Sequence, residues 1–395
     1  MGGLTGLVQG AVAGPAEIGL SLERMNRIEA IDALGRTMLV EAGATLQQIH
    51  EAAEREGLMF PLDLGARGSA LIGGNASTNA GGNRVIRYGM MRDMVLGLEA
   101  VLADGTVIPA LNRMIKNNAG YDLKQLFIGT EGTLGIVTRL VLRLRPLPLS
   151  HQTALLACTR FDQVTGLLGR LDSLLGGAMS SFEVMWSDFF GLVTTPPAVG
   201  RSPLAGEYPY YIIVESQGAD PIGDQARFES GLTTAAEEGR FADAAIASSQ
   251  SQRDAIWALR DDVGQMFRLG HPFVFDVSLP VAEMEGYVSE VHAAIAARMP
   301  QQRCFTFGHL GDGNIHFVVV GPAGPEARGS IEEIIYRPLG ARRGSVSAEH
   351  GIGLEKLAWL SLSRSESEIA LMRRLKQALD PRGILNPGRV IGGAG

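Results

Sequence analysis

Residues 61–89 read PLDLGARGSALIGGNASTNAGGNRVIRYG. Six of the 18 residues from Gly65 to Gly82 are glycine, and most of the others are small. The stretch shows neither helical nor strand periodicity, and a loop this long inside a compact domain usually carries function. Within it, GGNASTNAGG at 73–82 can present backbone N–H groups to a diphosphate, with Asn and Ser/Thr side chains in support. The alternative is a set of tight turns.

A second glycine-rich stretch lies at the start of the chain. Gly2, Gly3, Thr5 and Gly6 present a similar set of backbone N–H groups for a diphosphate. Neither stretch is the GxGxxG dinucleotide fingerprint, and each alone is weak evidence. For the stretch at the start of the chain, the alternatives are a tight turn and an N-terminus without fixed structure.

The composition is that of a globular protein with two or three domains. The chain has 395 residues, of which 46% are hydrophobic, 19% are charged and 51 are glycine. A formal net charge of −7 argues against a nucleic-acid partner. The two cysteines predict no disulfide framework and favour a reducing compartment. No apolar run reaches transmembrane length, and the first residues lack the basic region of a secretory signal.

The order of strand and helix patterns divides the chain. MVLGLEAVLADGTVIPAL, residues 94–111, predicts a hairpin around Asp-Gly. Thr45 and Gly57 are the expected ends of an early helix. Pro-Leu-Pro at 146–148 marks a boundary, and the alternating pattern over 150–300 predicts an α+β sheet domain with helices on one face.

HLGDGNIHFVVV, residues 309–320, predicts a second hairpin. If 311–314 form a four-residue turn, His309 lies directly opposite His316, close enough for both imidazoles to bind one cation. The residues alone favour the alternative, an ordinary polar pair across two strands.

Two further positions carry chemistry. Glu349 and His350 are adjacent in SAEHGIG, and His-His-Glu is a common ligand set for a divalent ion. The alternative is an N-cap cluster before a helix at Leu354. Arg260 lies on an expected amphipathic helix, where its guanidinium can bind a carboxylate through two hydrogen bonds. The alternative is a solvent-exposed arginine that pairs with Asp261 or Asp262.

Six stretches in this order resemble one family. They are the 61–89 stretch, GTEGTLGIVTRLVLRLRP, FDVSLP, HLGDGNIH, AEHGIGLEK and LNPGRVI. Together they resemble the FAD-linked D-2-hydroxy-acid dehydrogenases, which include the glycolate oxidase FAD subunit, D-lactate dehydrogenase and D-2-hydroxyglutarate dehydrogenase. The resemblance implies an α+β fold: a vanillyl-alcohol-oxidase (PCMH-type) FAD domain over residues 1–147 and an antiparallel-sheet substrate domain with a metal site over 148–350. Residues 351–395 would return to the flavin.

The resemblance also implies roles for individual residues. His309, His316 and Glu349 match the ligands of a divalent metal, zinc or manganese. His350 matches the catalytic base, and Arg260 matches an arginine that binds the substrate carboxylate. The positions that match FAD-binding residues are Gly3, Thr5, Gly6, Leu7, Ser69, Gly73, Gly74, Asn75, Thr78, Asn79, Gly81, Gly132, Ile136, Val137 and Asn386.

The chain departs from the family pattern at several positions. It begins inside the first phosphate loop, where relatives carry some tens of earlier residues, and we expect an N-terminal truncation. Val274 stands where a lysine is usual, Gly264 where a hydroxyl residue is usual, and Val318 where an asparagine often follows the second histidine. The loss of these polar groups argues against a dicarboxylate substrate such as D-2-hydroxyglutarate.

The expected reaction is oxidation of a D-2-hydroxy acid to the 2-oxo acid. The metal stabilises the forming alkoxide, His350 takes the proton and the flavin takes the hydride. The family passes electrons to a carrier (a quinone, a cytochrome or an electron-transfer flavoprotein) rather than to oxygen. We expect a cytoplasmic protein, with peripheral attachment to the inner membrane as an alternative, and a homodimer. The alternative functions are a flavin-free metal hydrolase and an inactive, poorly folded fragment of the oxidoreductase.

Overall fold

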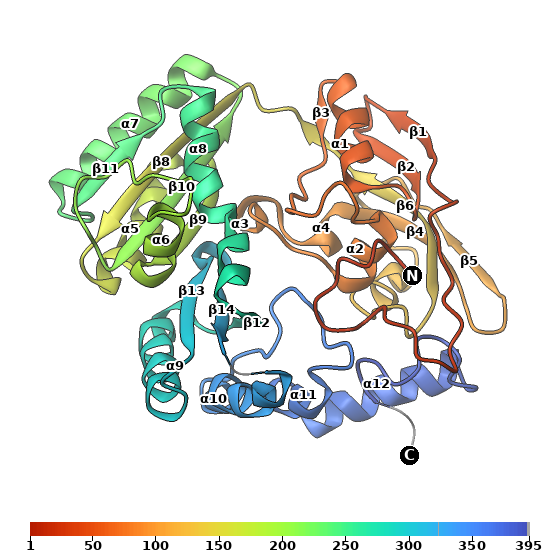
Figure 1. Cartoon of the computed structure of the whole chain (residues 1–395). Helices are drawn as coiled ribbons and strands as arrows, with labels where there is room; N and C mark the ends of the chain where they lie inside the picture. Colours follow the sequence, from red (N-terminus) through yellow and green to blue (C-terminus); the bar gives the residue numbers. More distant parts are fainter. Residues whose placement is uncertain (323, 393–395) are drawn as a thin grey trace. The chain divides into compact units, whose positions relative to one another are not determined.

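The computed structural model describes residues 1–322 and 324–392, which divide into two compact units (Figure 1). The first unit contains residues 1–84, 88–147 and the described part of 349–395. The second contains residues 85–87 and 148–348. The division into an FAD domain, a substrate domain and a C-terminal segment stays a functional prediction.

A five-stranded antiparallel sheet forms the centre of the first unit. Its strands in spatial order are β1 (Ile28–Asp32), β2 (Thr37–Glu41), β6 (Ile136–Arg143), β4 (Val95–Val101) and β5 (Val107–Ala110). The predicted hairpin is confirmed by β4 and β5, and Gly105 takes the positive φ that its turn requires, at 87°. A short pair, β3 (Leu58–Met59) with β7 (Arg145–Pro146), lies outside this sheet.

Helices cover the apolar face of this sheet. Helix α1 (Leu46–Arg55) begins at Thr45 with a capping box and is followed by Gly57 at φ 66°, as predicted. Its buried residues share one core with α2 (Ile72–Thr78) and α4 (Met91–Met94). A short helix, α3 (Val85–Tyr88), and the 3-10 turn Leu123–Leu126 also occur.

Helix α2 corrects the prediction that residues 61–89 contain no helix. A Cβ on Gly73 would lie 2.6 Å from the Cβ of Ala42. The helix backbone at Gly73 therefore packs directly against Ala42, the residue that follows β2. Glycine and small polar residues have low helix propensity, and tertiary packing overrides it here. The apolar stripe that normally reveals a helix is absent because the contact surface is glycine.

The C-terminal segment belongs to the first unit. It contains the 3-10 turn Leu357–Trp359, α11 (Leu360–Ser363) and α12 (Glu366–Leu379). The amides of Leu354 and Glu355 donate to Val8 O at 3.0 and 3.4 Å. Backbone bonds thus hold the C-terminal segment against the N-terminal loop.

The second unit contains a seven-stranded antiparallel sheet. Its strands in spatial order are β11 (Asp243–Ile246), β8 (Ser150–Cys158), β10 (Tyr210–Gly218), β9 (Met179–Trp186), β13 (Arg303–His309), β14 (Asn314–Gly321) and β12 (His271–Ser278).

Helices pack on both faces of this sheet, so the prediction of helices on one face is wrong. Alternate side chains of a strand point to opposite faces. On β10, Tyr210 packs against Phe161 of one helix, whereas Tyr211 stacks on Phe190 of another. One face carries α5 (Phe161–Leu175), α7 (Pro221–Glu237), α9 (Met284–Arg298) and α10 (Arg328–Ala341); the other carries α6 (Ser187–Thr194), α8 (Gln250–Asp261) and the 3-10 helix η2 (Val263–Leu269). Sequence alternation separates strands from helices but does not show which face each helix covers.

Among the described helices, none combines the length and the apolar character needed to cross a membrane.

The end of helix α12 depends on a buried ion pair. Asp380, 2% exposed, accepts hydrogen bonds from Lys376 Nζ at 2.6 Å and from the amides of Ile384 and Leu385 at 3.0 and 2.8 Å. Burial raises the pKa of Asp380, but these bonds outweigh burial and leave the pKa below its usual value. A carboxylate with a lowered pKa contributes stability at neutral pH that is lost as pH falls through the folded-state pKa.

We therefore expect Asp380→Asn to lower the free energy of unfolding by about 1–3 kcal/mol at pH 7. The difference from the unmodified protein should shrink below about pH 4, where the carboxyl of the unfolded chain is protonated. Urea unfolding at several pH values measures it. The control is Asp122→Asn, since Asp122 has a side chain that is 54% exposed and pairs with Lys124. Equal unfolding midpoints for the two variants at pH 7 would contradict the prediction.

Candidate functional site

The two histidines of HLGDGNIH come from adjacent strands of the second unit. His309 ends β13, a 3-10 turn covers Leu310–Asp312, and His316 lies in β14. The predicted register is wrong: His316 lies opposite Phe307, so His309 is its diagonal neighbour. The rings are nonetheless close, with centroids 5.3 Å apart and planes at 83°. The two strands are joined by the 3-10 turn followed by Gly313 in the left-handed conformation, at φ 85°, rather than by a four-residue turn over 311–314.

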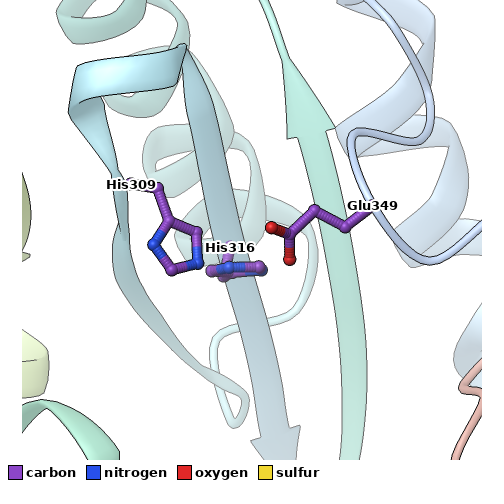
Figure 2. Close-up of side chains that lie close together, drawn as sticks. All are labelled: His309, His316 and Glu349. Atoms are coloured by element: carbon purple, nitrogen blue, oxygen red, sulfur yellow. The ribbon is translucent and has the colours of Figure 1, made fainter. Parts of the chain in front are cut away.

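Glu349 lies with both histidines, as Figure 2 shows, where the three side chains point toward one another. One ligand atom from each lies within 4.8 Å of the others. The residue before it, Ala348, donates its amide to Asp276 Oδ2 at 2.8 Å, and Ser345 bridges to Ser278. The N-cap alternative is wrong, since no helix begins at Leu354.

The three donors suit a divalent cation. Two imidazole nitrogens and one carboxylate oxygen are a common set for zinc, with bonds of about 2.0–2.2 Å, and leave other positions open. A small closing movement of the side chains would bring all three into contact with one ion. Both histidines are buried, whereas Glu349 is half-buried.

Arg260 points into the same region of the second unit. It is 6% exposed, so the alternative of a solvent-exposed arginine is wrong. Its Nε donates to Glu183 Oε2 at 3.1 Å, and its Nη2 lies 3.5 Å from His309 Nε2. The guanidinium carbon lies 4.6 Å from the centre of the Phe307 ring.

Two polar residues of this face were not predicted from the sequence. Glu183 lies between apolar neighbours in SFEVMW, and a lone acid inside a buried strand was the available signal. Asn314 is 2% exposed, and neither atom of its amide group has a hydrogen-bond partner among the described residues. A buried amide without partners is costly, so Asn314 is a candidate to contact a bound molecule.

His350 follows Glu349 and is half-buried. The segment after it is held by Glu131, whose carboxylate accepts the amides of Ile352 at 2.7 Å and Gly353 at 3.0 Å. Burial raises the pKa of Glu131, and the bonds from these amides offset part of that rise. The glutamate of TEGTLG therefore fixes the backbone two and three residues beyond His350.

The first unit brings together several of the segments that contain positions matching FAD-binding residues. A Cβ on Gly3 would lie 1.8 Å from Ser69 O, and one on Gly2 would lie 3.4 Å from the Cα of Gly74. Asn386 Nδ2 donates to Gly10 O at 3.0 Å and to Glu131 O at 2.6 Å. The N-terminal loop, α2, the TEGTLG turn and LNPG are thus neighbours although they are far apart in the chain.

The individual side chains have different environments. Thr78 Oγ1 donates to Gly74 O, and Asn79 ends α2 in the left-handed conformation with its Oδ1 accepting the amide of Arg92. Thr5, Gly6 and Leu7 are exposed, Gly81 is buried, and Ile136 and Val137 lie in β6.

Two features fit a large ligand in the first unit. The Nδ2 of Asn75, a residue that is 6% exposed, has no hydrogen-bond partner among the described residues. A Cβ on Gly6 or Gly132 would meet nothing within 4 Å. A buried donor without a protein partner and glycines with open space around their Cα atoms are both features of a cofactor-binding site.

Comparison with known proteins shows the family to which the chain belongs. The chain matches the family model described as FAD linked oxidases, C-terminal domain, over residues 147–390, and the FAD binding domain over residues 1–110. It is 38% identical to D-2-hydroxyglutarate dehydrogenase, mitochondrial, of Bos taurus, with 99% of this chain and 71% of that protein covered. It is 38% identical to D-2-hydroxyglutarate dehydrogenase of Xanthomonas citri pv. viticola, with 98% and 83% covered.

Among solved structures, p-cresol methylhydroxylase with substrate bound resembles the chain with a TM-score of 0.74 and 18% identity. The match covers 94% of this chain and 79% of that one, and it shows a shared fold alone. The chain belongs to the FAD-linked D-2-hydroxy-acid dehydrogenases. It is an FAD-dependent oxidoreductase, so the predicted fold class and FAD cofactor are confirmed, and the flavin-free hydrolase is excluded.

Substitutions at two glycines of the N-terminal loop can distinguish a role in folding from a role in cofactor binding. Gly3→Ala places a methyl group against the backbone of Ser69, whereas Gly6→Ala places one in space that no protein atom fills. We expect Gly3→Ala to lower the melting temperature of the FAD-free protein, and Gly6→Ala to leave it unchanged.

If Gly6 lines the cofactor, Gly6→Ala should instead weaken FAD binding, by about tenfold for one misplaced contact of 1.4 kcal/mol. Flavin fluorescence titration and a melting curve of each variant measure the two effects. FAD binding by Gly6→Ala at the unmodified affinity would remove Gly6 from the cradle.

Proposed function

We propose that this enzyme oxidises a D-2-hydroxy acid with the help of a divalent metal and passes the electrons to a carrier rather than to oxygen. The observation that supports it is the convergence of His309, His316 and Glu349, next to His350, in a chain of the FAD-linked family. The candidate carriers are a quinone, a cytochrome or an electron-transfer flavoprotein. A homodimer and a cytoplasmic or membrane-peripheral location are part of this proposal.

Oxidation of an alcohol carbon requires removal of the hydroxyl proton and of a hydride. FAD, when bound, supplies the hydride acceptor, and a metal, which His309, His316 and Glu349 would hold, would lower the cost of charge on the hydroxyl oxygen. His350 takes the hydroxyl proton, because a neutral imidazole is a base of suitable strength near pH 7. The adjacency of His350 to Glu349 in the chain supports this role.

Arg260 orients the substrate in this proposal. Its Nε is bonded to Glu183, so the two Nη groups remain to contact a carboxylate from one side. Nη2 already lies 3.5 Å from His309 Nε2, which places the guanidinium edge beside the proposed ligands. A substrate chelated through its hydroxyl and carboxylate oxygens would thus meet a cation within reach of the metal.

The chemical nature of the substrate's side chain remains to be determined. The relatives are named for D-2-hydroxyglutarate, which is therefore the first compound to test. Val274 and Val318 lie directly opposite each other on β12 and β14, on the face that carries His316. Val318 is 2% exposed in the apolar core of that face, so this pair offers no donor to a second carboxylate.

The first test is His350→Ala. We expect this variant to keep its bound flavin but to lose at least about a hundredfold in the rate of flavin reduction by D-2-hydroxy acids, because proton removal loses its base. Anaerobic stopped-flow absorbance of the flavin measures it. His271→Ala, at an exposed histidine of β12, is the control and should be unchanged. Unaltered reduction rates in His350→Ala would refute the assignment of the base.

A substrate panel tests the valine pair. We expect D-enantiomers to reduce the flavin and L-enantiomers not to, and we expect KM for D-2-hydroxyglutarate to be no lower than KM for D-2-hydroxybutyrate. A charged hydrogen bond to the second carboxylate, worth about 1.5–3 kcal/mol, would lower KM by about tenfold or more. A KM lower by that factor for D-2-hydroxyglutarate would show that another group replaces the missing polar contacts.

A further inference from the structure

Glu183 lies at the centre of a buried polar group on the sheet of the second unit. It is 1% exposed, and its Cα is paired with that of His309 across β9 and β13. Its Oε1 lies 2.8 Å from His309 Nδ1, and its Oε2 accepts from Arg260 Nε at 3.1 Å. One carboxylate therefore contacts both a candidate metal ligand and the candidate substrate arginine.

These contacts select one tautomer of His309. An ionised carboxylate only accepts hydrogen bonds, so Nδ1 must carry a proton to donate to Glu183. An arginine only donates, so Nε2, which lies 3.5 Å from Arg260 Nη2, faces the guanidinium with its lone pair. Both neighbours favour the same neutral imidazole, and its Nε2 is the nitrogen that can bind a metal.

The surroundings argue that Glu183 is more than a packing residue. Its flanking residues Phe182 and Val184 are buried, and apolar side chains such as Met185 and Phe307 form the core of the face it occupies. A buried ion pair recovers little or none of its desolvation cost, and an apolar residue of similar size is often as stable there. Its effect on His309 and Arg260 gives the carboxylate a use that an apolar residue lacks.

We propose that Glu183 is a positioning residue that orients His309 as an Nε2 ligand of the metal and holds Arg260 for the substrate carboxylate. The proposal rests on the metal-assisted function proposed above. A carboxylate that accepts the second N–H of a ligating histidine fixes the ring and raises its basicity, and removing it typically weakens metal binding by about 10–100-fold. Glu183 itself contacts neither metal nor substrate.

The test compares Glu183→Gln with a matched control, Glu215→Gln. Glu215 lies on the next strand, β10, is 3% exposed, and accepts bonds from Ser180, Gln217 and Trp257. Both variants remove one charge from a buried glutamate of the same sheet. The FAD-loaded proteins are freed of metal with a chelator and titrated calorimetrically with Mn²⁺ and with Zn²⁺.

We expect Glu183→Gln to bind the metal about 10–100-fold more weakly and Glu215→Gln to bind it within about twofold of the unmodified protein. Equal affinities in both variants would overturn the proposal, and so would equal weakening, because a general loss of packing would then explain the effect. Melting curves of both variants show whether either fails to fold.

A second measurement needs no substitution of the glutamate. Long-range proton–nitrogen NMR of ¹⁵N-histidine-labelled, metal-free protein reports the tautomer of each of the seven histidines, and a His309→Gln spectrum identifies the His309 signals. The proposal requires a proton on Nδ1, and a proton on Nε2 instead would overturn it. If the unmodified protein binds no divalent metal, the metal-assisted function is refuted. The tautomer of His309 then still tests whether Glu183 orients this histidine.

Discussion

A buried carboxylate must have partners, and this constraint organises the face of the second unit that carries the candidate site. Glu183 has almost no solvent contact and is held by Arg260 and His309. Desolvation of an ion costs several kcal/mol, so the strand that carries the imidazole and the helix that carries the guanidinium must both be in place for the charge to be tolerated. The sheet order β9, β13, β14 then aligns Glu183, His309 and His316.

The first unit meets a different constraint, the close approach of backbone segments. Gly3 lies against Ser69, and Gly73 against Ala42, at distances that exclude any side chain. Glu131 and Asn386 then connect these loops by hydrogen bonds to backbone groups of Gly10, Ile352 and Gly353. The result is a set of backbone groups from four distant segments, with the polar Asn75 amide and the open positions of Gly6 and Gly132 left for a ligand.

The predictions from sequence succeeded where a pattern is local. Asp-Gly between alternating apolar residues correctly predicted the hairpin of β4 and β5, and Thr45 correctly predicted the N-cap of α1. They failed where packing decides. Helix α2 has no apolar stripe because it packs through Gly73, and the two faces of the second sheet are distinguished only by alternate residues such as Tyr210 and Tyr211.

The sequence by itself determined the family and the placement of His309 and His316 on neighbouring strands of one hairpin. The actual register differs from the predicted one by two residues, and an even shift keeps both rings on the same face, with their centroids 5.3 Å apart. Only the tertiary structure decided which groups surround that pair. Glu183 is 126 residues from His309 and 77 from Arg260 in the chain, and no local periodicity connects them. Their contact arises because a buried charge and its partners are satisfied together only in the completed sheet.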